Sequence, residues 1–145
     1  MLEQIRTRLG EQLPGSRWQR FEIAEDIDEL IRIAGQIADG SAIVMPWRER
    51  AGQQSLSAGG FRQRVETEFA VGMVVRHYSN RMGGERARHF DLLKGDIEEA
   101  LAGWMPEGFV SPCELIGGES SPITTGVSIY VQTWATARFL TGDHQ

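Results

Sequence analysis

The side chains best suited to covalent chemistry or metal binding are few in this sequence, and their spacing matches no known site. The three histidines, His77, His89 and His144, and the single cysteine, Cys113, lack the spacing of a metal site. The sequence also contains no nucleophile elbow, no phosphate-binding glycine loop and no dinucleotide-binding motif. We therefore expect no catalytic residue, no metal and no cofactor. A thiol enzyme that pairs Cys113 with a histidine is the alternative, and it predicts that iodoacetamide labels the native protein.

Three carboxylates, Glu25, Asp26 and Asp28, lie close together and could suggest a cation site. Their spacing fits no calcium-binding loop of the EF-hand type. They lie at the start of a segment in which the apolar positions Ile27, Leu30, Ile31 and Ala34 recur with helical spacing. The first turn of a helix favours negative charge. We therefore interpret the carboxylates as the start of a helix within residues 24–40.

Charged and amide side chains cluster between residues 48 and 66, and most of the cations are arginines. Arginine suits paired contacts with carboxylates at interfaces, and charged pairs at the rim of an interface set its register. The formal net charge of −5 argues against a general nucleic-acid binder. We expect contacts with other protein subunits to be made by Arg48, Glu49, Arg50, Gln53, Gln54, Arg62, Arg64 and Glu66.

The element that positions these residues is a long alternating stretch, Arg62–Tyr78 (RQRVETEFAVGMVVRHY). Apolar and polar residues alternate over more than a dozen positions, which predicts a half-buried β-strand. Gly72 in its middle suggests a bulge or a bend. A short apolar strand, Ser41–Trp47, precedes a polar loop, Arg48–Gly60. Together they predict a β-hairpin whose outer half, Arg62–Glu68 with that loop, projects as an arm.

Two other segments have strong helical spacing of apolar residues, Met1–Leu13 and Glu85–Trp104. Gly95 suggests a bend or a close contact in the second of them. Further short strands are predicted at Ser16–Ile23 and near residues 113–116, the latter ending at Gly117-Gly118. A long final strand spans residues 126–140, and residues 141–145 are expected to fray. On this final strand, we expect the small apolar residues to face the core, leaving as an exposed interface face Tyr130, Gln132, Trp134 and Arg138.

These elements predict an α+β fold in which an antiparallel or mixed sheet has helices packed on one face and a long hairpin arm. The 145 residues fit one domain, residues 1–145. The N-terminus is charged throughout, so we do not expect a signal peptide there. No apolar run reaches the length of a membrane span.

The order of these segments resembles the tail terminator proteins of long-tailed phages and prophages. The resemblance covers nearly the whole chain, and no single motif carries it. Its segments are MLEQIRTRL, WQRFEIAEDIDELI, SAIVMPWRERAG, RQRVETEFAVGMVVRHY, HFDLLKGDIEEALAGWMPEG and CELIGGESSPITTGVSIYVQTWATARF.

This resemblance implies a structural subunit of a homo-oligomeric ring, expected to be a hexamer. The ring would cap the tail tube, stop its polymerisation and present a surface to head-completion proteins. DNA would be met only as it passes through the ring. Assembly would take place in the host cytoplasm, and the product would be part of the virion tail. In the family, the hairpin loop is mobile in the free subunit and orders on assembly; its counterpart here is Arg48–Gly60.

A second function class stays open from the residues themselves. The chain could be a small-molecule-binding regulatory α+β module in which Trp18, Tyr130 and Trp134 line a pocket. That hypothesis predicts that metabolites change the tryptophan fluorescence.

Overall fold

A computed structural model describes residues 1–34, 36, 39–56, 58–76, 83–124 and 127–142. The histidines His77 and His144 and the end of the predicted long strand at Tyr78 lie outside the described residues. In chain order, the elements are α1 (Leu2–Gln12), β1 (Arg20–Ile23), α2 (Ile27–Ala34), β2 (Ser41–Gln54), β3 (Phe61–Arg76), α3 (Gly83–Leu101), β4 (Ser111–Thr124) and β5 (Val127–Gly142).

The five strands form one mixed sheet in the order β1-β2-β3-β5-β4. β1 and β2 run parallel, and the three other neighbouring pairs are antiparallel. This sheet with its helices confirms the predicted α+β class. The long strand β3 lies at its centre, where it pairs along its length with both β2 and β5.

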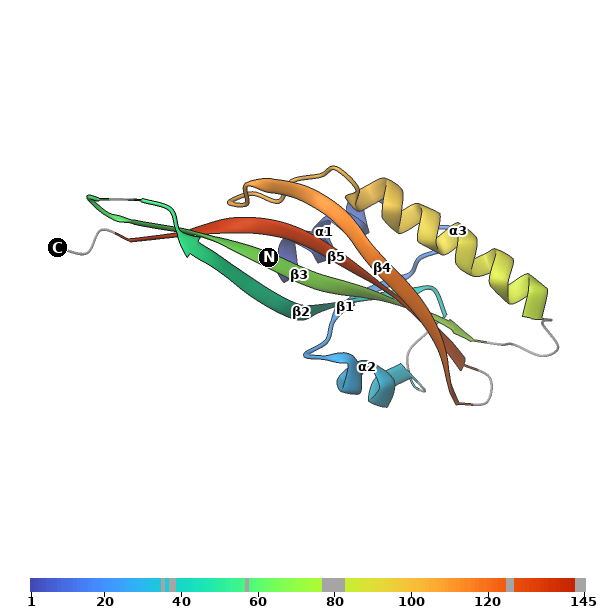
Figure 1. Ribbon diagram of the computed structural model, residues 1–145. Coiled ribbons are helices and arrows are strands. Elements are labelled where there is room, and N and C mark those ends of the chain that lie inside the picture. The colour runs from blue at the N-terminus through green and yellow to red at the C-terminus, as the bar shows by residue number, and fades with distance from the viewer. Residues whose placement is uncertain (35, 37–38, 57, 77–82, 125–126, 143–145) are drawn as a thin grey trace.

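The larger hydrophobic core lies on the face of the sheet that α1 and α3 cover (Figure 1). Alternate residues of β3, among them Phe69, Val71 and Met73, point into it and are fully buried. The helices contribute Ile5 and Leu9 from α1 and the stripe Leu93, Ile97 and Leu101 from α3. The apolar spacing in the sequence therefore predicted these two helices and this face of β3 correctly.

The prediction that all helices pack on one face is wrong, because α2 lies on the opposite face of the sheet (Figure 1). Its buried residues Leu30 and Ala34 belong to a second core with Ile43, Ala70 and Val74. Both parities of β2 and β3 are apolar in this region, so both faces need cover.

Gly72 marks the closest approach of α2 and not a bulge. Its pairing with Ile43 and Val131 continues without a shift in register. A Cβ atom at this position would lie 2.7 Å from Leu30 Cδ2. The absence of a side chain is what lets Leu30 pack directly on the strand. Gly95, in contrast, has open space around it, so no close contact explains it.

The predicted loop Arg48–Gly60 is mostly strand, because β2 continues to Gln54. Pro46 does not end the strand, since β1 pairs with β2 only as far as Val44. Beyond that point β2 is an edge strand, where a missing N–H is tolerated. The turn itself is short and uses Gly59 and Gly60 at φ +72° and +134°, values that favour glycine.

Two further boundaries differ from the prediction. β4 passes through Gly117 and Gly118 and reaches Thr124, with a shift in register between Leu115 and Gly117. β5 extends to Gly142, which pairs with Phe61, so residues 141–142 are not frayed; residues 143–145 lie outside the described part of the chain.

The projecting arm therefore has three strands and not two. We define it as residues 48–54 of β2, 61–68 of β3 and 135–142 of β5. It extends from the sheet beyond the helices, with the β2–β3 turn at its end (Figure 1). A third strand gives the arm the support that a lone two-stranded hairpin lacks.

Candidate assembly interface

Arg48 and Glu68 form an ion pair at the base of the arm. The Glu68 side chain is only 7% exposed, and its Oε2 atom accepts a hydrogen bond of 2.6 Å from Arg48 Nε. A carboxylate this buried needs a charged or hydrogen-bonding partner. Of the residues expected to make intersubunit contacts, Arg48 therefore already has a partner within the subunit.

Glu49 connects all three strands of the arm. Its carboxylate accepts a 2.9 Å hydrogen bond from the Thr67 hydroxyl on β3. It also accepts two bonds of 3.1 Å from the Arg138 guanidinium on β5. A bidentate arginine–carboxylate pair fixes geometry as well as charge. Glu49 and Arg138 therefore stabilise the arm itself.

Three arginines of the arm have no carboxylate partner among the described residues. Arg50 lies opposite Glu66 in the β2–β3 register, but no ion pair joins them. The Arg62 guanidinium lies 3.9 Å from the centre of the Phe139 ring, a cation–π contact. Arg64 is exposed beside it. These cations are available to bind a partner.

The glutamines of the arm have different environments. Gln54 accepts a hydrogen bond from the Leu56 backbone nitrogen and donates one of 2.8 Å to the Leu56 carbonyl, which shapes the turn. Gln53 is exposed at an irregularity in the β2–β3 register. The neighbouring strand adds a third amide contact, from Gln63 Nε2 to the Gly52 carbonyl at 2.7 Å.

The prediction that Tyr130, Gln132 and Trp134 form an exposed face is wrong. Trp134 is fully buried, and Gln132 is buried with its Nε2 atom 2.9 Å from Glu98 Oε2 of α3. Tyr130 is half-buried against Phe90, with ring centres 5.9 Å apart. This parity of β5 faces α3, where large side chains fill the space between sheet and helix.

The predicted aromatic pocket is wrong for the same reason. Trp18 is also buried, and its indole N–H donates a 2.8 Å hydrogen bond to Asp96 Oδ2 on α3. Arg17 binds the same carboxylate through two bonds of 2.9 and 2.8 Å. These contacts attach the segment before β1 to α3, and the Arg17 hydrogen bonds hold the pKa of Asp96 below its ordinary value.

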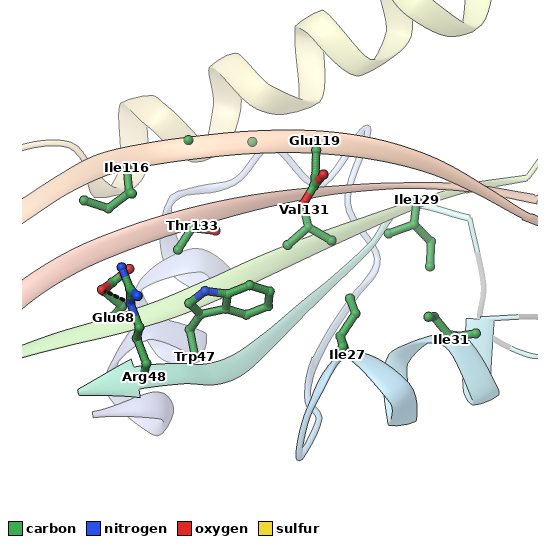
Figure 2. A pocket seen from close by; sticks show the side chains of 12 residues that line it. Ile27, Ile31, Trp47, Arg48, Glu68, Ile116, Glu119, Ile129, Val131 and Thr133 are labelled. Atoms are coloured by element: carbon green, nitrogen blue, oxygen red, sulfur yellow. Dashed lines mark hydrogen bonds and ion pairs between the residues drawn. The ribbon is translucent and has the colours of Figure 1, made fainter. Parts of the chain in front are cut away.

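Sequence reasoning missed an apolar groove of about 620 Å³ on the α2 face of the sheet (Figure 2). Val131 and Thr133 of β5 lie at its floor. Its walls expose three large side chains: Ile31 of α2 at 45%, Trp47 of β2 at 43% and Ile116 of β4 at 52%. A signal was available, since α2 is too short to cover every apolar position on this face of β5.

The cysteine and the acidic cluster noted in the sequence each have a local structural explanation. Cys113 is buried, and burial raises the pKa of its thiol to about 12. Asp26 accepts a 2.9 Å hydrogen bond from the Glu29 backbone nitrogen, as a residue preceding a helix does. The described ranges hold no group of three or more histidine, cysteine or acidic side chains placed to bind a metal ion. They also include no helix with the length and apolar character needed to cross a bilayer.

Comparison with known proteins identifies the family of this chain. No curated protein matches the sequence closely enough to be counted as a relative. A family model does match: the model for phage tail terminator proteins covers residues 2–143 of the 145. This match confirms the family resemblance that was inferred from the sequence. The chain therefore belongs to the phage tail terminator family, a family of structural proteins of the phage tail.

Proposed function

We propose that this protein forms a homo-oligomeric ring, expected to be a hexamer, that caps the completed tail tube. In that position it stops polymerisation of the tube protein and offers its outer surface to a head-completion protein. Assembly takes place in the host cytoplasm, and DNA meets the protein only in passing through the ring. Family membership supports this role. The observation that carries it is the arm, which projects from the core and bears three arginines that have no carboxylate partner among the described residues.

The charges of the arm fall into two groups with different tasks. The pairs Arg48–Glu68 and Glu49–Arg138 are satisfied within the subunit and hold the three strands together. Contacts with a neighbouring subunit or with the tube are proposed for the arm residues without such pairs, which are Arg50, Gln53, Arg62, Arg64 and Glu66, with Gln54 shaping the turn. Exposed charges at a rim guide association and its register more than they add affinity.

The charge reversal Arg50→Glu tests this proposal. The Arg50 side chain is exposed and forms no hydrogen bond or ion pair with any other residue that the structure describes, so the substitution should leave the unfolding transition unchanged and weaken assembly. Light scattering coupled to size exclusion, with magnesium and with the cognate tail tube protein, measures assembly. Arg88→Glu is the matched control, because Arg88 is an exposed arginine on α3, away from the arm.

Two results would contradict the proposal. If Arg50→Glu assembles like the wild type, the arginines of the arm are not part of the interface. If the wild-type protein stays strictly monomeric and also neither binds nor shortens tubes of the tail tube protein, the capping role is wrong.

A further inference from the structure

Both edges of the sheet include a stretch that no other described strand covers. On β2, the pairing with β1 ends at Val44, although the strand continues along the arm. On β4, the backbone of Cys113 is bonded to the loop that follows α3, and Pro122 has no N–H group to donate. We call residues 46–54 the arm edge and residues 114–121 the β4 edge. Unpaired strand edges of this kind are templates for pairing with another chain.

The arm edge turns backbone hydrogen-bonding groups away from the sheet. The Arg62 carbonyl on β3 accepts a bond of 2.8 Å from the Ser55 backbone nitrogen, so even-numbered residues of β3 turn their backbone groups toward β2. Arg50 lies opposite one of them, Glu66, and its backbone therefore bonds inward. The backbone groups that point outward on either side of it are those of Glu49 and Ala51.

The β4 edge has the same arrangement. The Ala137 carbonyl on β5 accepts a bond of 2.8 Å from the backbone nitrogen of Val110, just before β4, so odd-numbered residues of β5 turn toward β4. Glu119 lies opposite one of them, Val131, and its backbone bonds inward. The backbone groups that point outward on either side of it are those of Gly118 and Ser120. Each edge thus has outward backbone groups, which no other described element binds, on both sides of one charged residue.

The directions of the two edges allow them to pair. Neighbouring strands from β2 through β3 and β5 to β4 are all antiparallel, so β2 and β4 run in opposite directions. A second copy placed edge to edge, with its α2 face turned the same way, would therefore add an antiparallel strand. The arm edge and the β4 edge are also similar in length.

Unpaired charges of opposite sign lie on the same face of the two edges. Glu66 has the parity of Ala70 on β3, which belongs to the core under α2, so Arg50 opposite Glu66 lies on the α2 face. Glu119 lies on this face as well, since it lines the groove beside α2 (Figure 2). Both the Arg50 and the Glu119 side chains are exposed, and neither forms an ion pair with another residue that the structure describes.

We infer that the arm edge of one subunit pairs with the β4 edge of a second copy, with Arg50 opposite Glu119. In this register the outward backbone groups on either side of these two residues meet as well. By residue count, β4 then ends at Thr124 beside Met45, just past the part of β2 that β1 covers. Each contact uses two different edges, so subunits add head to tail until the rotation between them closes a ring. This pairing rests on the proposed ring and assigns its two contacting surfaces.

Charge reversal on both edges tests the pairing, with assembly measured by light scattering coupled to size exclusion. Arg50→Glu and Glu119→Arg each place like charges opposite one another, so each should weaken assembly at least about threefold per contact. The double variant Arg50→Glu/Glu119→Arg should assemble like the wild type. An equimolar mixture of the two single variants should also associate, because contacts between the two kinds of subunit join unlike charges.

Glu114→Arg is the matched control for the register. Glu114 is an exposed glutamate on the same strand, but the proposed register places it opposite the β2–β3 turn. Combined with Arg50→Glu, this substitution should not restore assembly. All the substituted side chains are exposed, so the fold is retained, which circular dichroism checks.

A cysteine cross-link provides an independent test. Arg50 and Glu119 would form a pair without backbone bonds between them, with Cα atoms about 4.5 Å apart, which suits a disulfide. In a Cys113→Ala background, the double variant Arg50→Cys/Glu119→Cys should form disulfide-linked chains up to the size of the ring on oxidation. Either single cysteine variant should give at most a dimer.

Four results would overturn the inference. They are single reversals that leave assembly unchanged, a double reversal or a mixture that stays as weak as the single variants, rescue of Arg50→Glu by Glu114→Arg, and a double-cysteine protein that stays monomeric on oxidation.

The tail tube protein separates this inference from the proposed function. If the wild-type protein limits tube length but the double reversal does not restore assembly, the capping function stands and the pairing of the two edges is wrong. If the cross-linked rings form as described but do not limit tube length, the capping function is wrong and the pairing stands.

Discussion

Substituting Gly72 by alanine should destabilise the protein, because this glycine lies at the contact between the central strand and α2. The new Cβ atom would be 2.7 Å from Leu30 Cδ2 and 3.4 Å from Met45 Cε. Carbon atoms pack best at about 3.5–4.0 Å, so Leu30 must move. Leu30 is fully buried and lies on a helix of eight residues, so its side chain must shift within a packed core.

The expected size follows from two opposing terms. Overpacking a core by one methyl group costs about 1–3 kcal/mol. Removing a glycine from a strand interior returns about 0.5–1 kcal/mol of backbone entropy. At the middle of these two ranges, the net loss in the free energy of unfolding is about 1 kcal/mol, which lowers Tm by roughly 2–4 °C in a protein of this size.

Urea unfolding followed by far-ultraviolet circular dichroism measures the loss. Gly95→Ala is the control with the opposite sign, since Gly95 lies inside α3 with nothing within 4 Å of its added Cβ. That variant should gain about 0.4–1 kcal/mol. In a Leu30→Ala background the cost of Gly72→Ala should disappear, because the clashing atom is gone. A neutral Gly72→Ala, or one with the same cost in both backgrounds, would refute the packing argument.

Two further predictions concern titratable groups on the α3 side of the sheet. The pKa of Asp96 is lowered in the folded state, chiefly by its hydrogen bonds with Arg17, so its contribution to stability is complete above the ordinary carboxyl pKa and is lost as the pH falls through the lowered value. Asp96→Asn should remove this part of the acid dependence of the unfolding free energy, and an unchanged acid dependence would contradict it. The Cys113 pKa of about 12 leaves almost no thiolate at pH 8, so iodoacetamide should label the protein only after unfolding. Rapid labelling of the native protein would show that the thiol is not buried.

The alternation of residues predicted where strands lie better than it predicted which face they present. β3 could be located because Phe69, Val71 and Met73 recur at every second position, and charged residues occupy the alternate positions in the outer half of the strand. On β5 the small apolar parity is largely buried as expected, at Val127, Ile129, Ala135 and Ala137, but the same reasoning wrongly took Trp134 as exposed. Whether a face of β5 is buried depends on which helix packs over it, and this is fixed by the tertiary structure. α3 packs over the face that carries Tyr130 and Trp134. α2 leaves part of the opposite face, at Val131 and Thr133, open to the groove.

The boundary predicted between the strand Ser41–Trp47 and the loop Arg48–Gly60, just after Pro46, failed for a similar reason. A proline is incompatible with a central strand but not with an edge strand, and β2 becomes an edge strand only because β1 is short. Nothing local in the sequence fixes where β1 stops pairing. The residues from Arg48 onward were therefore assigned to a loop, although a run of polar residues also fits a strand that is exposed on both faces.

One extra residue at the base of the arm determines which face each charge of β2 presents. The β2–β3 register shifts between Pro46 and Arg48, so Trp47 and Arg48 both line the groove on the α2 face. A bulge of this kind reverses the parity of the residues that follow it, here as far as the next register shift between Ala51 and Gln54. Without it, Arg48 would face α1 and α3, leaving the buried carboxylate of Glu68 without its partner. Glu49 would then turn away from Thr67 and Arg138, and the three strands would lose the ion pair that joins them. The same bulge thus places Trp47 in the groove and brings Arg48 and Glu49 to the partners that hold the three strands of the arm together.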